Sequence, residues 1–244
     1  MKFFGKNSFL ILAIIVVFSC QKSRVVVVQS SSIPVGASIR ENQQLQLFLI
    51  PYQDSLKQSM GVVLSYSLEN LERQQPEGKL GNLTVDILRN AAIERGVIDA
   101  EKFPVLAILN NGGLRSPILA GDVTVGSIYK LVPFDNEVVY MRLPTTVLPD
   151  LHEVLIRKGG EPISGGIVNQ DGIQLEDETA LRQDSIWLIT SDYLAQGNDG
   201  FEELRKFEYE SAQILLRELF LEEIAKKDTI RIAIDGRWNL NKAE

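Results

Sequence analysis

A glycine-rich turn has the residue types that bind an anion. Asn110 and Asn111 end a continuous apolar run, and Gly112 and Gly113 follow directly. Glycine lets backbone N–H groups approach a ligand closely, and the guanidinium of Arg115 can bond two phosphate or ribose oxygens at once. Spacing alone favours the simpler interpretation, a tight turn followed by a surface arginine, because glycine-rich turns occur in every fold class.

Two aromatic residues far apart in the chain are candidates for stacking on a base. Phe134 precedes an expected strand, and Tyr193 lies in the loop of residues 191–201, which follows another expected strand. Asp199 in the same loop has neighbours that tolerate positive φ, so the turn can direct its carboxylate at a ligand. The alternatives are core aromatic side chains and an aspartate that only stabilises its own turn.

The chain has few residues that could form a metal or thiol site. Its one histidine is His152, and its one cysteine is Cys20. Dinuclear metal centres use several His and Asp ligands, so we expect no cofactor and no catalytic residue in this chain. His152 falls on a predicted helix without a partner cluster, which favours a structural role.

Periodic patterns predict the elements that hold these residues. Apolar residues recur at steps of three and four in residues 38–60, 145–157 and 209–226, which predicts helices. Continuous apolar runs at 105–109 and 186–190 predict buried strands. Because helices and strands interleave, with hairpin-like pairs in the middle, we expect an α/β fold of the mixed-sheet α+β kind, with helices layered on sheets.

The composition is that of a globular protein with an acidic balance. The 244 residues are 45% hydrophobic and 23% charged, and the formal net charge is −7. A chain of this length buries a sizeable core without disulfides. The negative field repels polyanions, so we expect no nucleic-acid binding, although a small anion can bind where an arginine and backbone N–H groups converge.

The N-terminal segment has the pattern of an export signal. Lys2 and Lys6 precede ten apolar residues at 9–18, whereas a membrane-spanning helix needs roughly 20. Residues 17–20 resemble a bacterial lipobox, in which the cysteine, here Cys20, is lipidated and becomes the first mature residue. The alternatives are plain signal cleavage and a buried N-terminal strand.

Three regions follow from that pattern. Residues 1–19 are predicted to be a lipoprotein signal peptide, residues 20–37 the lipidated cysteine and its tether, and residues 38–244 the folded domain. The protein is then exported and anchored through its lipid to the membrane of the bacterial cell envelope. Gln21 suggests, by analogy, the outer membrane, with the domain on the periplasmic face or at the surface.

Short motifs in a fixed order resemble those of the C-terminal domain of the 5′-nucleotidase family. Each motif is weak by itself, and the shared order over residues 40–238 makes the resemblance specific. The motifs are Glu77, residues 81–83 (GNL), 110–115 (NNGGLR), 132–134 (VPF), 165–166 (GG), 193–201 (YLAQGNDGF) and 235–237 (DGR).

The resemblance implies a nucleotide-binding site. The base would lie between the rings of Phe134 and Tyr193, Asp199 would contact the nucleoside, and the glycine-rich turn would bind the ribose and phosphate. Gly165 would line the base pocket, and Arg73 could substitute for a phosphate-holding arginine that family members often have near the position of Glu77. The implied binding residues are Asn110, Gly112, Arg115, Phe134, Gly165, Tyr193 and Asp199.

The resemblance also implies a division of labour. The family's metallophosphoesterase domain is not in this sequence, so the chain is expected to be the nucleotide- or nucleoside-recognising half of a 5′-nucleotidase-type phosphohydrolase in nucleotide catabolism. A separately encoded metallophosphoesterase would be its partner and would hold the divalent metals, so activity of this chain alone is not expected. The alternatives are a stand-alone nucleoside- or nucleotide-binding lipoprotein without catalysis, and a structural or adhesion module.

Overall fold

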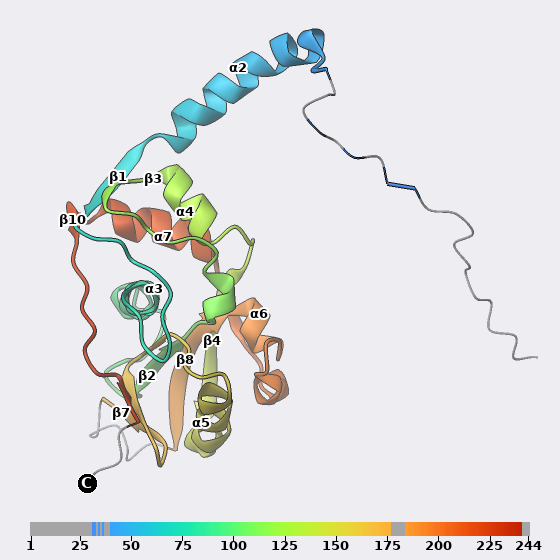
Figure 1. The fold of residues 1–244 in the computed structure, drawn as a ribbon. Coiled ribbons are helices and arrows are strands. Elements are labelled where there is room, and N and C mark those ends of the chain that lie inside the picture. The colour runs from blue at the N-terminus through green and yellow to red at the C-terminus, as the bar shows by residue number, and fades with distance from the viewer. Residues whose placement is uncertain (1–30, 33, 35, 37–39, 177–183, 241–244) are drawn as a thin grey trace, which may run out of the picture. The chain divides into compact units, whose positions relative to one another are not determined.

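A computed structural model describes residues 31, 32, 34, 36, 40–176 and 184–240 (Figure 1). The predicted signal peptide, Cys20 and most of the predicted tether lie outside the described residues. The chain divides into two units, residues 1–48 and 49–244. The second unit contains every candidate binding residue.

Helix α2 (Gln43–Met60) is the predicted helix of residues 38–60, with a later start. It begins at Gln43 because the side chain of Asn42 accepts hydrogen bonds from the N–H groups of Gln44 and Leu45, which caps the helix. Pro51 lies inside α2 and does not split it. Among the described residues, the helices are too short or too polar to cross a bilayer.

The central element of the second unit is a five-stranded mixed sheet in the order β5-β2-β8-β4-β9. β2 and β8 run parallel, and β4 is antiparallel to both β8 and β9. The strands are β2 (Val105–Ile108), β4 (Glu137–Pro144), β5 (Ile163–Ser164), β8 (Ser185–Ser191) and β9 (Glu210–Leu215). The predicted mixed-sheet class and the two predicted buried strands are therefore confirmed.

Helices cover both faces of this sheet, which explains why its middle strands have continuous apolar runs. Val105 and Ala107 of β2 pack into a core with α3 (Lys79–Glu94) and α7 (Leu216–Ala225). Leu106 and Ile108 alternate to the opposite face and join α5 (Leu148–Arg157). Figure 1 shows α3 and α5 on opposite sides of β2 and β8.

Two small sheets and several short helices complete the unit. One sheet has the order β10-β1-β3 and the other the order β11-β6-β7. Their strands are β1 (Val63–Ser67), β3 (Gly121–Thr124), β10 (Thr229–Ile230), β6 (Gly166–Asn169), β7 (Ile173–Leu175) and β11 (Trp238–Asn239). Among the described residues, the other helices are α4 (Val125–Leu131), α6 (Asp192–Ala195) and the 3-10 turns η1 (Asn111–Gly113), η2 (Thr145–Val147) and η4 (Glu202–Lys206).

The prediction of one helix over residues 209–226 is wrong in its first third. Residues Glu210–Leu215 form β9, and only Leu216–Ala225 form α7. The edge of β4 supplies hydrogen bonds to β9, and Gln213 takes a positive φ of 55° where the pairing is irregular. This tertiary pairing outweighs the helical spacing of Ile214, Leu215 and Leu219.

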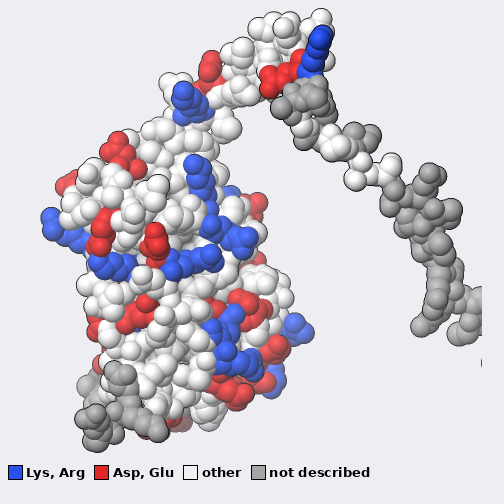
Figure 2. Space-filling model, viewed as in Figure 1, with Lys and Arg blue, Asp and Glu red and all other residues white. Residues whose placement is uncertain are grey.

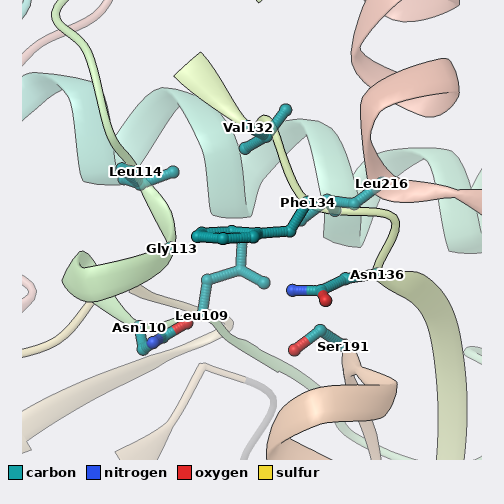
Figure 3. Close-up of a pocket in the computed structure, with 9 residues that line it drawn as sticks. All are labelled: Leu109, Asn110, Gly113, Leu114, Val132, Phe134, Asn136, Ser191 and Leu216. Atoms are coloured by element: carbon teal, nitrogen blue, oxygen red, sulfur yellow. The ribbon is translucent and has the colours of Figure 1, made fainter. Parts of the chain in front are cut away.

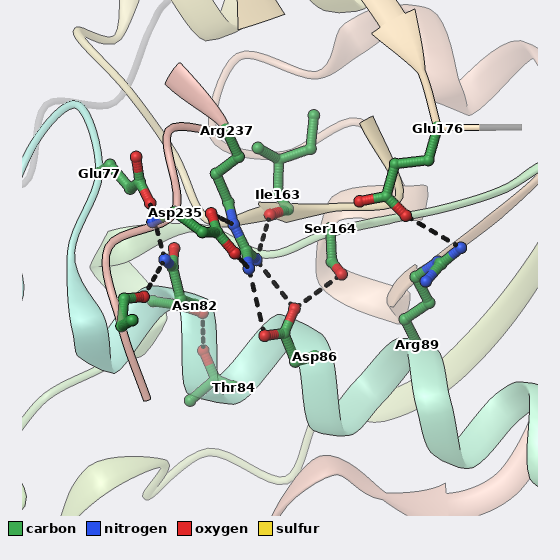
Figure 4. Close-up of polar contacts among 12 residues, drawn as sticks. Glu77, Asn82, Thr84, Asp86, Arg89, Ile163, Ser164, Glu176, Asp235 and Arg237 are labelled. Carbon is green, nitrogen blue, oxygen red and sulfur yellow. Dashed lines mark hydrogen bonds and ion pairs between the residues drawn. The ribbon is translucent and has the colours of Figure 1, made fainter. Parts of the chain in front are cut away.

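A buried arginine fastens the C-terminal segment to α3 (Figure 4). The guanidinium of Arg237 pairs with Asp86 of α3 at 2.8 Å and with Asp235 of its own segment. It also donates to the backbone oxygen of Ile163. A buried charge is tolerated only when it is paired. These contacts therefore hold the segment around Arg237 against α3 and β5.

Candidate nucleotide-binding site

The sheet topology brings three segments to one edge. The turn after β2 and the loop after β8 adjoin because these strands are parallel, with Leu106 opposite Leu188. β4 is antiparallel to β8, with Val138 opposite Ser191, so the loop that precedes β4 arrives at the same edge. Residues from three distant stretches of the sequence therefore meet where their strands end or begin.

These segments surround an open cavity of about 370 Å³. Sites for drug-sized ligands occupy about 300–1,000 Å³, so the cavity has room for a nucleoside. Its lining residues are Asn110, Gly112, Gly113, Arg115, Phe134, Asn136, Tyr193 and Asp199. Six of the seven predicted binding residues are in this set, and only Gly165 is not.

The two candidate stacking rings both line the cavity and are half-exposed. Phe134 is 48% exposed and Tyr193 is 41% exposed, whereas Phe201 and Phe220 are buried in the core. The alternative interpretation, that these two aromatic side chains are buried in the core, is therefore wrong for both. An exposed aromatic face beside polar groups is a surface on which a flat ring can stack.

Phe134 is supported from behind by apolar side chains (Figure 3). Leu109, Leu114 and Val132 line the narrow space against which its ring lies. Arg217 of α7 holds the loop, since its guanidinium donates to the backbone oxygen of Phe134 at 3.4 Å and pairs with Asp135. This pairing raises the pKa of Arg217, and the loop is tied to a rigid helix by a permanent charge.

Tyr193 is fixed by the capped turn that follows β8. The side chain of Ser191 accepts from the N–H of Leu194, and the carboxylate of Asp192 accepts from the N–H of Tyr193. Asn198 returns to donate its amide to the backbone oxygen of Tyr193 at 2.9 Å. The short helix α6 thus begins with its orphan donors satisfied, which holds the ring at the cavity.

Asp199 and Asn110 connect the loop after β8 to the turn after β2. The side-chain amide of Asn110 donates to Oδ2 of Asp199 at 2.7 Å. Asp199 has a φ of 55°, the left-handed conformation that aspartate and asparagine accept more readily than other residues. The lysine Lys158 pairs with Oδ1 of the same carboxylate at 2.7 Å, so both oxygens are held and each keeps a lone pair for a ligand.

Two arginines lie beside the glycine-rich turn. Arg115 lines the cavity, and its guanidinium carbon is 5.9 Å from the centre of the Phe134 ring. Arg73 is exposed and donates to the backbone oxygen of Asn111 at 3.0 Å. On the face shown in Figure 2, acidic and basic side chains are mixed. Positive charge at the turn is therefore local, as a small anion requires.

Gly165 has a structural role outside the cavity. It has a φ of 88°, and a Cβ at this position would lie 2.0 Å from the backbone oxygen of Val105 and 2.7 Å from Nε of Arg89. Only glycine permits this approach of β5 and β6 to β2. The structure therefore gives a packing reason for Gly165, which is not among the residues that line this cavity.

Several residues at the site had no sequence signal. Asn136 lines the cavity, and Lys158 and Glu161 bond to residues that line it or adjoin its lining. Burial raises the pKa of Glu161, although bonds from the N–H of Asn111 and from Lys158 partly oppose the rise. Burial also opposes the charge of Lys158, but its bonds to Asp199 and Glu161 outweigh this effect and raise its pKa.

The described residues do not fit a catalytic metal centre. Residues 40–176 and 184–240 contain no group of three or more His, Cys, Asp and Glu side chains arranged to hold a metal ion. His152 is half-buried, and its Nε2–H donates to the backbone oxygen of Asn169 at 2.8 Å. The histidine thus supports a turn and lies apart from the cavity.

Comparison with known proteins identifies the region that carries this cavity. Residues 59–154 match the family model described as "5'-nucleotidase, C-terminal domain". This part of the chain is therefore similar to the C-terminal domain of 5′-nucleotidases. The match spans the glycine-rich turn and Phe134 and ends before Tyr193 and Asp199, which the fold brings to the same cavity.

Two relatives extend this similarity over more of the chain. A 5′-nucleotidase from Vibrio parahaemolyticus serotype O3:K6 is 25% identical over 190 residues, which are 72% of this chain and 32% of that protein. Protein UshA from Escherichia coli strain K12 is 26% identical over 179 residues, or 68% of this chain and 31% of that protein. The chain therefore spans about a third of the length of these relatives.

A solved structure shares the fold. The 5′-nucleotidase precursor from Thermus thermophilus superposes with a TM-score of 0.65 at 19% sequence identity. The alignment covers 84% of this chain and 44% of the other. The arrangement of mixed sheets and helices is thus that of 5′-nucleotidase C-terminal domains, and the cavity lies where parallel strands end, a common place for a ligand.

Proposed function

We propose that this domain binds a nucleotide or nucleoside and presents it to a separate metallophosphoesterase in nucleotide catabolism. The observation that carries the proposal is that Phe134 and Tyr193, half-exposed and 59 positions apart, line one cavity of about 370 Å³. Stacking on aromatic rings is worth about 1–3 kcal/mol per base and tolerates any base.

The polar lining supports the same ligand class. The carboxylate of Asp199 is an acceptor for hydroxyl groups of a sugar, and the guanidinium of Arg115 is a donor for phosphate oxygens. One wall therefore suits the base and another the sugar and phosphate. The rings, Asp199 and Arg115 thus suit the base, the sugar and the phosphate of a nucleotide, respectively.

A partner would supply the chemistry that the described residues do not provide. Divalent metals activate water for attack on phosphorus, and the described part of this chain offers no cluster of ligands for them. This domain would contribute by holding the nucleotide in a fixed orientation, which lowers the entropic cost of reaction. We further propose that Cys20 carries a lipid anchor at the cell envelope, so the two proteins would meet outside the cytoplasm.

Binding and reconstitution test the proposal in sequence. Calorimetry of the purified chain with AMP and adenosine should show binding, and a Phe134→Ala/Tyr193→Ala double variant should lose it. Adding the chain to a purified metallophosphoesterase encoded beside it should raise kcat/KM for AMP, whereas adding the double variant should not. Binding without any rise would indicate a stand-alone binding lipoprotein, and absence of binding would refute the proposal.

The anchor is tested separately. The wild-type protein should incorporate labelled palmitate when expressed with its own N-terminus, and Cys20→Ala should abolish the label. Labelling of the alanine variant at the wild-type level would show that Cys20 is not the acylated residue.

A further inference from the structure

The side chain of Lys158 donates hydrogen bonds to two acidic residues, Asp199 and Glu161. Its Nζ lies 2.7 Å from Oδ1 of Asp199, 3.2 Å from the backbone oxygen of Asp199 and 2.9 Å from Oε1 of Glu161. A lysine ammonium has three N–H donors, so these three acceptors account for all of them. Lys158 therefore has no donor left for a ligand and acts on the site through Asp199.

Glu161 joins the same lysine to the glycine-rich turn. Its side chain is only 3% exposed, and Oε2 accepts the backbone N–H of Asn111 in the glycine-rich turn. The side-chain amide of Asn111 donates in turn to the backbone oxygen of Gly160 at 3.0 Å. The turn that follows α5 is thus bonded to the turn that follows β2.

Together these contacts close a ring. Asn110 bonds to Asp199, Asp199 to Lys158, Lys158 to Glu161, and Glu161 to the N–H of Asn111, which neighbours Asn110. The ring holds the two loops of the cavity at a fixed separation. Gln75 fixes the turn that carries it by donating to the backbone oxygens of Lys158 and Gly160, both at 2.9 Å.

We infer that Lys158 and Glu161 are positioning residues for the proposed nucleoside site, which hold the carboxylate of Asp199 and the turn of Asn110 in the geometry that accepts the sugar. This inference rests on the proposed function. The charges explain why a lysine is needed: Glu161 and Asp199 repel one another, and the ammonium pairs with both. Without it, the two carboxylates would face one another with no positive charge between them.

The test compares adenosine binding by the full chain and its variants. Lys158→Met should weaken adenosine binding by about tenfold or more, because it removes a charged hydrogen bond from the carboxylate that receives the sugar. Lys226→Met is the matched control, since Lys226 pairs with Glu223 of α7 in an exposed ion pair. Lys158→Gln, which retains hydrogen-bonding capacity, is the second variant if Lys158→Met does not fold.

A double-mutant cycle separates positioning from general stability. The effect of Lys158→Met should disappear in an Asp199→Asn background if the lysine acts through that carboxylate. An effect that simply adds to that of Asp199→Asn, or adenosine binding by both Lys158 variants at the wild-type level, would overturn the inference and leave the proposed function intact. Failure of the wild-type protein to bind AMP or adenosine would overturn both.

Discussion

The side-chain amide of Asn110 donates to the carboxylate of Asp199 over 2.7 Å, although 89 positions separate them. The bond joins the turn after β2 to the loop after β8, and the parallel pairing of these strands makes it geometrically available. It also settles the orientation of the Asn110 amide, because only its nitrogen can donate to a carboxylate. The amide oxygen of Asn110 is therefore turned elsewhere, toward Gly113.

Asp199→Asn should weaken nucleoside binding by about 1.5–3 kcal/mol, the typical worth of a hydrogen bond to a charged group. The change keeps the size of the side chain and removes the charge that Lys158 and a ligand hydroxyl share. Calorimetry with adenosine measures the loss. Asp122→Asn, an exposed position on β3, serves as the control and should bind like wild type.

Removing either proposed stacking ring, Phe134 or Tyr193, should weaken ligand binding without lowering the stability of the fold. Phe134→Ala and Tyr193→Ala are each expected to cost about 1–3 kcal/mol of binding free energy for any nucleoside base. Both side chains are half-exposed, so the melting temperature should change little. Tyr66→Ala, which removes a ring of similar exposure on β1, should leave binding unchanged. A large fall in melting temperature with the two site variants would mean that the rings are structural.

The central strands and most of the residues that line the cavity could be predicted from the sequence. β2 and β8 are buried on both faces, so their residues form continuous apolar runs, and the order of the motifs indicated the rest. β9 was missed because an edge strand depends on the neighbour that pairs with it, here β4. Lys158, Glu161 and Arg217 were missed for the same reason, since each acts on a loop distant in sequence.

Gly165 was assigned to the base pocket by resemblance, and its surroundings predict a different phenotype. Gly165→Ala should destabilise the fold by about 1–3 kcal/mol more than Gly96→Ala, because both glycines have a positive φ but only Gly165 would place a Cβ against backbone. Chemical denaturation of the two variants measures the difference. Equal losses, together with weaker adenosine binding by Gly165→Ala alone, would restore the pocket role.

Glu161 should make stability depend on pH in a defined direction. Burial raises the pKa of Glu161 in the folded protein above its ordinary value of 4.5. At a pH between 4.5 and that raised pKa, the folded state holds a proton that the unfolded state has released. The stability that this proton contributes is lost as pH rises through the folded pKa. The free energy of unfolding of wild type minus that of Glu161→Gln should therefore fall as the pH rises above about 4.5. A difference independent of pH would contradict the burial effect.

Arg115 should distinguish a nucleotide from a nucleoside. Its guanidinium lies at the cavity beside the glycine-rich turn, where it can reach a phosphate, whereas the base and sugar have other partners. Arg115→Ala is thus expected to weaken AMP binding by about tenfold while changing adenosine binding by much less, and the AMP effect should shrink as salt is added. Arg231→Ala, an exposed arginine on the C-terminal segment, controls for the change in net charge. Equal losses for AMP and adenosine would mean that Arg115 supports Phe134 through its cation–π contact and does not bind the phosphate.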